Sequence, residues 1–453
     1  MKIRKLAACL FAVTSLASLT VNSALTSYAL PSGQNTMRDM TTMEIVEDMG
    51  IGINLGNTFE SCGDWIGQYG DGSVTSYETA WGSPSVTEDL IKGYANAGFD
   101  TLRIPVAWSN MMTDTDQYTI NADYLKRVTQ VVDWALDADL YVIMNLHWDG
   151  GWLDKVPTDF DGCLKKYSLI WTQLADSFKD YGDHLIFESQ NEELGWNDIW
   201  NPWGGTDGKE ESYSYVNTIN QKFVDIIRQS GGNNEKRHLL ISGYQTDVSR
   251  TCDPLFKMPD DPAGRCAVSV HYYTPAGFAI LTQDESWGKA SSTWGTDAEY
   301  AELNSNMDML KTTFVDNGIP VIIGEYGCPK ENKEEESVRR FLSSVCEAAL
   351  SRDGICPVLW DITDLHYNRT SFEMTDKELQ NQLLEVKEKY ASKEDIKGDV
   401  NSDGAFNVSD AVMLQKYLVN SETLTNNLAA DLNNDNIIDV FDLTLMKRML
   451  ING

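Results

Sequence analysis

The chain has few basic residues for its length. Of its 453 residues, 36 are lysine or arginine and 68 are aspartate or glutamate, which gives a formal net charge of −32. Nucleic-acid binding requires a basic patch that displaces counterions, and an anionic membrane surface attracts basic segments. The composition therefore argues against nucleic acid and membrane as partners. By itself the acidity is explained by solubility, and it is compatible with a neutral binding partner.

Paired histidines and paired cysteines are lacking as well. The five histidines form no HxxxH or HxH pair, which argues against a metalloenzyme. The eight cysteines are scattered without CxxC spacing, so neither a zinc site nor a disulfide framework is indicated. Cys252 and Cys266 could pair, but unpaired buried thiols explain the seven cysteines after Cys9 at least as well.

Long apolar runs are absent beyond the N-terminus, so no later segment is expected to span a membrane. At the N-terminus, Lys2, Arg4 and Lys5 precede a short apolar stretch, and residues 27–29 fit the small-x-small cleavage pattern. We therefore expect a signal peptide over residues 1–29 and a secreted protein.

Eight short apolar runs alternate with helical stretches in the middle of the chain. Nearly continuous apolar strands are typical of a parallel sheet that is covered on both faces. The runs are Ile51–Leu55, Thr101–Val106, Tyr141–His147, Leu185–Glu192, His238–Gly243, Ala267–Tyr273, Pro320–Tyr326 and Pro357–Asp361. Helical patterns cover Asp123–Asp137, Tyr213–Gln229, Val338–Leu350 and Leu379–Lys393. Eight such units predict an α/β fold, the (β/α)8 barrel.

Polar and aromatic residues stand at or near the C-terminal ends of these runs. They are Arg103, Asn145, His147, Asn191, Glu192, His271, Tyr273, Glu325 and Trp360. Barrels of this kind build their active sites at that face. A salt bridge at the end of a strand could explain one such residue. Isolated buried charges are costly, however, and here six strands end in polar or aromatic residues. The pattern indicates a functional site.

Two of these residues, Glu192 and Glu325, end the fourth and seventh runs. Glycoside hydrolysis uses two carboxylates that face each other across a sugar, and a separation of roughly 5 Å allows direct attack with retention. We expect Arg103 to keep Glu325 ionised as the nucleophile. A less polar pocket is expected to keep Glu192 protonated as the acid.

The remaining residues at the strand ends suit supporting roles. Tyr273 and His271 can donate hydrogen bonds to the nucleophile and to substrate hydroxyls, and Asn191 can bind the sugar 2-OH. Trp360 offers a flat apolar face for a sugar ring, and Trp148 and Trp152 are further candidate platforms. The segment 195–208, rich in Trp and Gly, is expected to form a wall of the cleft.

These motifs together resemble glycoside hydrolase family 5 over residues 37–390. They are Gly52–Asn57, Glu78–Gly82, Leu102–Val106, Asn145–His147, Asn191-Glu192, His271–Tyr273 and Ile323–Gly327. The first two look most like subfamily 4, a group of β-glucanases. The resemblance implies a retaining endo-β-1,4-glucanase with Glu192 as acid/base and Glu325 as nucleophile. It also implies supporting roles for Arg103, His147, Asn191, His271, Tyr273 and Trp360.

The resembled subfamily acts on cellulose, mixed-linkage glucan, xyloglucan and sometimes xylan, and the sequence does not choose among them. A xylanase or mannanase on the same barrel is the alternative enzyme. A non-catalytic glycan-binding protein would keep the aromatic residues but would need neither carboxylate.

The C-terminal tail contains two copies of a calcium-loop pattern, 32 residues apart. Oxygen-bearing side chains at loop positions one, three, five, nine and twelve follow the spacing of an EF-hand loop. The expected ligands are Asp399, Asn401, Asp403, Asn407 and Asp410 in the first copy and Asp431, Asn433, Asp435, Asp439 and Asp442 in the second. Helices are expected at Ala411–Val419 and Leu443–Leu450.

This duplicated loop and helix resembles a type I dockerin over residues 397–453, joined to the barrel by a linker at residues 391–396. The resemblance implies two structural Ca²⁺ ions, no cofactor for catalysis, and a cohesin domain of a scaffoldin as the partner, as in a cellulosome. The positions that would contact the partner carry Val408-Ser409 and Val440-Phe441.

Overall fold

The computed structural model describes residues 35–193, 199–390, 397–401, 405–419, 421, 424, 428–433 and 437–452. The expected signal peptide, the linker and the calcium-ligand candidates Asp403 and Asp435 lie outside the described residues. Within those ranges, no helix combines the length and apolar character that crossing a lipid bilayer requires.

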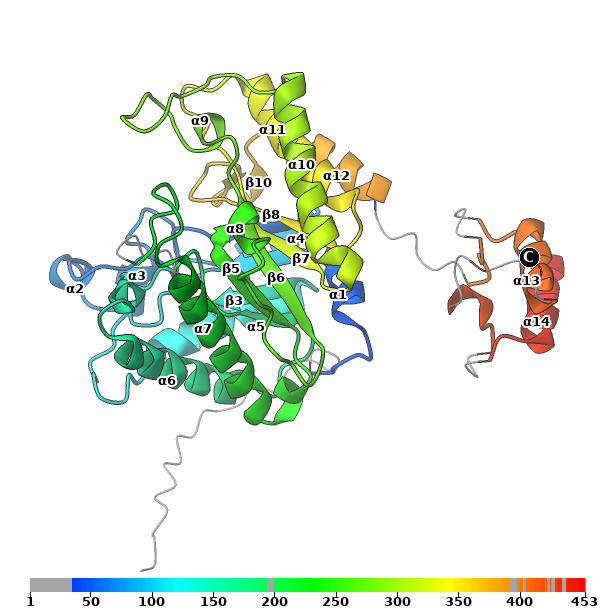
Figure 1. The fold of residues 1–453 in the computed structure, drawn as a ribbon, viewed down its shortest axis with the longest axis horizontal. Coiled ribbons are helices and arrows are strands. Elements are labelled where there is room, and N and C mark those ends of the chain that lie inside the picture. The colour runs from blue at the N-terminus through cyan, green and yellow to red at the C-terminus, as the bar shows by residue number, and fades with distance from the viewer. Residues whose placement is uncertain are drawn as a thin grey trace, which may run out of the picture.

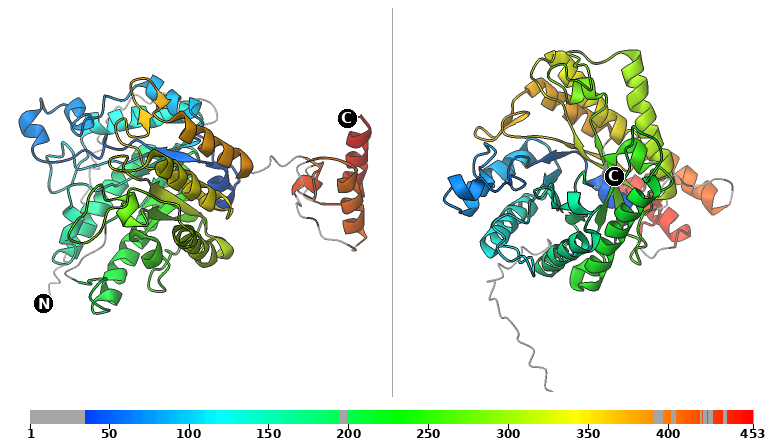
Figure 2. Two further views of the ribbon diagram at one scale, coloured as in Figure 1. Left: turned by 90° about the horizontal axis from the view of Figure 1, so that it is seen from above. Right: turned by 60° about the vertical axis from the view of Figure 1, so that its left-hand side comes forward.

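Eight parallel strands close into a barrel in chain order, and β8 pairs with β1. Their bounds are β1 Gly52–Asn54, β2 Thr101–Ile104, β3 Tyr141–Asn145, β4 Leu185–Glu188, β5 Leu239–Asp247, β6 Cys266–Tyr272, β7 Val321–Tyr326 and β8 Ile355–Leu359. Helices surround the strands (Figures 1 and 2). The predicted (β/α)8 barrel is confirmed. A separate two-stranded sheet follows it, formed by β9 (Tyr367–Asn368) and β10 (Glu373–Met374).

The helices begin where side chains can cap them. Asn121 accepts the backbone N–H groups of Asp123 and Tyr124 at the start of α5, whose buried residues recur at helical spacing. The helices of the barrel region are α1 Thr42–Asp48, α2 Ile66–Tyr69, α3 Val74–Glu78, α4 Glu88–Asn96, α5 Ala122–Asp137, α6 Phe160–Phe178, α7 Lys209–Gln229, α8 Val248–Thr251, α9 Ala276–Ala279, α10 Asp297–Thr313, α11 Glu335–Leu350 and α12 Lys377–Tyr390, with 3₁₀ turns η1 Trp152–Lys155, η2 Gly232–Glu235 and η3 Val315–Asn317.

The barrel interior is packed with side chains and is closed at one end. The alternating residues Ile143, Ile186 and Ile322 point inward from their strands and form one apolar cluster with Ile45 and Met49. The last two belong to α1 and the residue that caps it, so this helix covers the N-terminal end of the barrel. The opposite, C-terminal end is the face left for a site.

Strand β4 ends earlier than predicted, and this affects where Glu192 lies. It pairs with β5 only through Phe187 and Glu188, after which Ser242 bonds to the side chain of Ser189 and to the carbonyl of Gln190. Glu192 therefore lies on the loop beyond β4. Strand β5, in contrast, continues to Asp247, beyond its predicted end.

The C-terminal region has a small core of its own. Its helices α13 (Val408–Leu418) and α14 (Val440–Asn452) and the turn η4 (Leu428–Ala430) enclose a cluster that includes Val400, Leu414, Leu432 and Met446. Both helices begin three residues before their predicted starts, because the capping residue is at loop position nine.

Candidate active site

The two carboxylates singled out by the sequence lie together at the C-terminal mouth of the barrel. Glu325 is in β7, beside His271 of β6, and Glu192 is on the loop after β4. One carboxylate oxygen of each glutamate and a ring nitrogen of His271 all lie within 4.8 Å of one another. The side chain of Glu192 is 49% exposed, whereas that of Glu325 is only 7% exposed.

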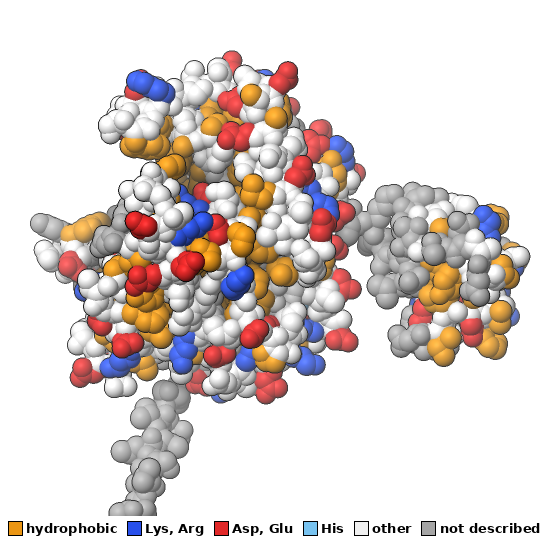
Figure 3. Space-filling model, viewed as in Figure 1, with side chains coloured by type: hydrophobic (Ala, Val, Ile, Leu, Met, Phe, Trp, Pro, Cys, Tyr) orange, Lys and Arg blue, Asp and Glu red, His pale blue; other side chains and the backbone are white. Residues whose placement is uncertain are grey.

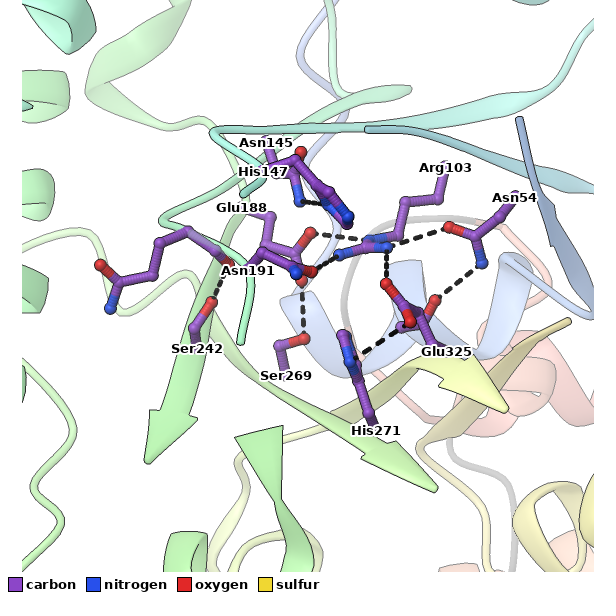
Figure 4. Close-up of polar contacts among 12 residues, drawn as sticks. Asn54, Arg103, Asn145, His147, Glu188, Asn191, Ser242, Ser269, His271 and Glu325 are labelled. Carbon is purple, nitrogen blue, oxygen red and sulfur yellow. Dashed lines mark hydrogen bonds and ion pairs between the residues drawn. The ribbon is translucent and has the colours of Figure 1, made fainter. Parts of the chain in front are cut away.

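Arg103 of β2 is the centre of the hydrogen-bond network under the nucleophile candidate. Its fully buried guanidinium donates from Nη1 to Glu325 Oε1 (2.8 Å), from Nε to Glu188 Oε2 (2.8 Å) and from Nη2 to Asn191 Oδ1 (2.9 Å). Tyr273 donates from its hydroxyl to the other oxygen of Glu325 (2.9 Å). Figure 4 shows Arg103 reaching between Glu188 and Glu325. Both oxygens of Glu325 are thus fixed.

The charges in this cluster favour the protonated form of His271. Burial opposes the charging of its ring, but the charge of Glu325 and the hydrogen bond to Glu192 outweigh burial and raise the pKa of His271. Its Nδ1 lies 2.7 Å from Glu192 Oε1. Despite partial burial, this contact lowers the pKa of Glu192. Burial raises the pKa of Glu325, and the charges of His271 and Arg103 offset it only in part.

The prediction of a less polar pocket around Glu192 is wrong. The ring of His271 and open solvent flank this carboxylate. Arg103 does contact Glu325 as expected, but it shares its charge with Glu188.

The ring of His147, after β3, is stacked with the ring of Trp360, after β8. Their rings are parallel within 4° and their centroids are 6.1 Å apart. Asn145 Nδ2 lies 3.2 Å from His147 Nδ1, while Asn145 Oδ1 accepts the backbone N–H of Val106, which orients the imidazole. Burial and the charge of Arg103 lower the pKa of His147 well below its usual value, so this ring is neutral.

The two other candidate sugar platforms, Trp148 and Trp152, differ in exposure. Trp148 is 46% exposed after β3. Trp152 is partly buried, donates from Nε1 to Asp149, and has Lys166 Nζ 4.4 Å from its ring centroid, so one face is covered. In the expected wall 195–208, residues 195–198 are not described, Trp200 is buried and Trp203 is 89% exposed.

Three polar residues of the site were missed by sequence reasoning: Asn54, Glu188 and Ser269. Asn54 joins Arg103 to the backbone of β7 and β8, and Ser269 donates to Glu188. Glu188 carried a readable signal, because a carboxylate inside an apolar strand requires a buried partner. Nothing in the sequence marked Ser269.

Among the described residues, Glu192, His271 and Glu325 are the group whose ligand atoms are close enough to hold a metal ion. Both oxygens of Glu325 already accept hydrogen bonds, and a protonated His271 repels cations. The arrangement therefore suits proton transfer better than metal binding. The seven cysteines in the described chain, including Cys252 and Cys266, are free thiols.

The two C-terminal loops place buried carboxylates at matching positions. Asp410 accepts the N–H groups of Asn407 (2.8 Å) and Asn401 (3.3 Å), and Asp442 accepts those of Asp439 (2.9 Å) and Leu432 (2.8 Å). Both side chains are fully buried, and no lysine or arginine of the described ranges pairs with them. Buried anions with oxygen-rich neighbours fit a hard cation such as Ca²⁺.

A closed barrel with paired carboxyl groups at its C-terminal mouth defines the class of (β/α)8 glycoside hydrolases. Residues 63–366 match the model of cellulase (glycosyl hydrolase family 5), and residues 397–451 match that of the dockerin type I domain. The chain belongs to glycosyl hydrolase family 5: it is an endo-β-1,4-glucanase that carries a C-terminal type I dockerin. Both matches lie within the predicted domains 37–390 and 397–453, whose boundaries stay predictions.

Three similar proteins illustrate this membership. Endoglucanase B of Clostridium cellulovorans is 33% identical over 405 residues, covering 85% of each chain. The xyloglucan-specific endo-β-1,4-glucanase of Bacteroides ovatus is 36% identical over 353 residues, covering 74% of this chain and 68% of that protein. The solved structure of a subfamily 4 broad-specificity endoglucanase from an uncultured bovine rumen ciliate superposes with a TM-score of 0.69 at 35% identity, covering 77% of this chain and 99% of that one.

Proposed function

We propose that this enzyme is secreted and hydrolyses internal β-1,4-glucosidic bonds of cellulose, lichenan and xyloglucan with retention of configuration. Glu325 is the nucleophile and Glu192 the acid/base. The observation that supports retention is the spacing of their carboxylate oxygens, within 4.8 Å. Retaining enzymes hold the two carboxyl groups about 5–5.5 Å apart, whereas inverting enzymes need about 6.5–9.5 Å to admit a water.

In the first step Glu325 attacks the anomeric carbon while Glu192 protonates the departing oxygen. In the free enzyme the proton is on His271, 2.7 Å from Glu192. A bound glucan excludes water from the exposed face of Glu192, which raises the pKa of this carboxylate and draws the proton from His271. Arg103 and Tyr273 hold one oxygen of Glu325 each, so that the attacking carboxylate is already oriented.

In the second step Glu192, now a carboxylate, takes a proton from water. The water oxygen bonds to the anomeric carbon, and the bond to Glu325 breaks. Asn191 accepts from Arg103 through its Oδ1, which leaves its amide nitrogen for the sugar 2-OH. That contact strengthens in the transition state.

The substrate proposal depends on the relatives and on the aromatic surface. The similar proteins are named as endoglucanases, one specific for xyloglucan and one of broad specificity. Trp148 and Trp360 follow β3 and β8 at the C-terminal mouth of the barrel, and Trp148 is 46% exposed, so both are candidate platforms for the apolar faces of glucose units. The platform role of Trp152 stays a prediction, since Lys166 covers one of its faces.

Two measurements test this proposal. NMR should show the β-anomer as the first product, whereas an initial α-anomer would establish inversion and refute the nucleophile assignment. Initial rates on carboxymethyl-cellulose, lichenan, xyloglucan, xylan and mannan should be highest on the glucans. A preference for xylan or mannan would favour the alternative hydrolases, and the absence of any product would favour a glycan-binding protein.

For the C-terminal region we propose two Ca²⁺ ions and a cohesin domain of a scaffoldin as the partner, which places the enzyme in a cellulosome outside the cell. The candidate ligands are those of the two loops, with Asp410 and Asp442 buried at the last ligand position of each. The exposed residues Val408, Val440 and Phe441 would meet the cohesin. The view in Figure 3 shows apolar side chains at the surface of this region. Calcium titration of the full chain by calorimetry should give two ions per chain.

A further inference from the structure

Glu188 is a buried carboxylate at the end of β4 that no step above uses. It is fully shielded from solvent, so it cannot touch a glucan. Its Oε2 accepts from Arg103 Nε (2.8 Å), and its Oε1 accepts from Ser269 Oγ (2.7 Å). Figure 4 shows Glu188 and Glu325 on two sides of the same guanidinium.

One cation therefore serves two buried anions. Arg103 donates to Glu188 and to Glu325 at the same distance, 2.8 Å. Away from water, electrostatic interactions are strong, and a guanidinium that is bound to one carboxylate attracts the other less. The strength with which Arg103 holds Glu325 thus depends on Glu188.

The glycine at position 324 leaves space for the hydrogen-bond network around Arg103. A Cβ atom at Gly324, the residue before the nucleophile, would lie 3.3 Å from Ser269 Oγ, 3.3 Å from His271 Nε2 and 3.5 Å from Arg103 Nε. The first two distances are tighter than ordinary contacts, so a side chain at position 324 would press on Ser269 and His271. Ser269 and Glu188 thus form one ordered unit with Arg103.

We propose that Glu188 is a positioning residue that, with Ser269, sets how strongly Arg103 binds the nucleophile Glu325. By taking part of the positive charge, Glu188 leaves Glu325 more nucleophilic than an undivided Arg103–Glu325 pair would. This inference rests on the proposed function, because it requires Glu325 to be the group that attacks.

The test is the pH dependence of trapping Glu325 with 2,4-dinitrophenyl 2-deoxy-2-fluoro-β-cellobioside. Its activated leaving group needs no protonation, so the acidic limb of the trapping rate reports the nucleophile alone. In Glu188→Gln, Arg103 interacts fully with Glu325 and a nearby negative charge is lost, so the acidic limb should move down by about one pH unit. The trapping rate above that limb should fall about threefold, since a weaker base is a poorer nucleophile and Brønsted slopes are about one half.

A second variant predicts a shift of opposite sign. In Ser269→Ala, Glu188 loses a hydrogen bond and binds Arg103 more strongly, so Glu325 loses part of its support. The acidic limb should then move up by a few tenths of a pH unit. This variant removes a single hydroxyl, so it keeps the test available if Glu188→Gln does not fold.

The matched control is Asp261→Asn. It breaks a mostly buried arginine–carboxylate pair, with Arg228, before β6 at the other end of the barrel. It should lower thermal stability without moving the limb. Unshifted limbs in Ser269→Ala and in folded Glu188→Gln, or shifts of the same sign, would overturn the role of Glu188. Trapping of the wild type at a residue other than Glu325 would instead refute the proposed function.

Discussion

The barrel and the dockerin differ in what neutralises their buried carboxylates. In the barrel, Glu188 and Glu325 share the guanidinium of Arg103. In the dockerin, Asp410 and Asp442 accept only backbone N–H groups from the described residues. The described barrel therefore contains its own counter-charge, whereas the proposed Ca²⁺ ions would supply it in the dockerin.

The two regions also differ in the size of their cores. The main cluster of the barrel draws residues from all eight strands and most of the surrounding helices. Among the described residues of the dockerin, the apolar core cluster consists of Val400, Ala411, Leu414, Ala430, Leu432 and Met446. A domain of this size buries little apolar surface, so metal binding should contribute much of its folding free energy. The barrel should therefore lose function through substitutions in its active site, whereas the dockerin should unfold when Ca²⁺ is removed.

The largest expected effect is on chemistry in the barrel. Glu325→Gln keeps the shape of the side chain but removes the attacking oxygen anion, so kcat on soluble β-glucan should fall about 10⁵-fold. Calcium binding and thermal unfolding of the dockerin should not change. The control is Glu388→Gln on the exposed face of α12, which should retain full activity. Undiminished hydrolysis by Glu325→Gln would refute the nucleophile assignment.

Calcium removal should have the reverse effect. Excess EGTA would leave Asp410 and Asp442 as buried anions without a cation, so the calorimetric transition of the dockerin should disappear. Affinity for the matching cohesin should drop by at least about 10³-fold, and added Ca²⁺ should restore both. Hydrolysis should stay within about twofold, because the catalytic network uses Arg103 instead of a metal. Loss of hydrolysis in EGTA would contradict the prediction that catalysis in the barrel is independent of calcium in the dockerin.

Much of the fold was predictable because it depends on local pattern. A strand buried on both faces must be apolar along its whole length, so eight runs were readable without any contact information. Glu192 and Glu325 were predictable for the complementary reason: they are polar where packing alone would favour apolar residues. The dockerin was predictable because the candidate ligands of each loop are close together in sequence.

What could not be predicted depends on contacts between distant strands. The sequence does not show that the side chain of His271, on β6, reaches the loop after β4 and lies 2.7 Å from the carboxylate of Glu192. Ser269 is an ordinary serine until β6 places it beside Glu188. The early end of β4 follows from bonds of Ser242, on a different strand.

A smaller effect should appear in barrel stability alone. Among the described residues, the buried guanidinium of Arg237 has no carboxylate partner; it donates instead to the carbonyls of Phe178, Tyr181, Gly182 and Leu185. Arg237→Met would remove these four buried side-chain hydrogen bonds, which should lower the free energy of unfolding by about 3 kcal/mol.

The matched control for that change is Arg265→Met, since Arg265 is partly exposed and donates to a single carbonyl, that of Lys236. It should cost less than about 1 kcal/mol. Calorimetry of the calcium-loaded chain separates the two transitions, and only that of the barrel should move. An equal fall in the dockerin transition would show that the two regions unfold as one.

The smallest expected effect concerns the acidity of the nucleophile in the barrel. Tyr273 donates a hydrogen bond to the ionised form of Glu325, and burial already raises the pKa of that carboxyl group. Tyr273→Phe removes this support, so the pKa should rise further and the acidic limb of kcat/KM should move up by about half a pH unit. Below the limb a larger share of the enzyme is protonated and inactive, whereas near neutral pH the loss is modest. The profile of kcat/KM against pH on lichenan, measured with and without EGTA, checks both the sign and the independence from calcium. A limb that moves down, or one that shifts with the chelator, would contradict the view that the barrel supplies every charge its chemistry needs.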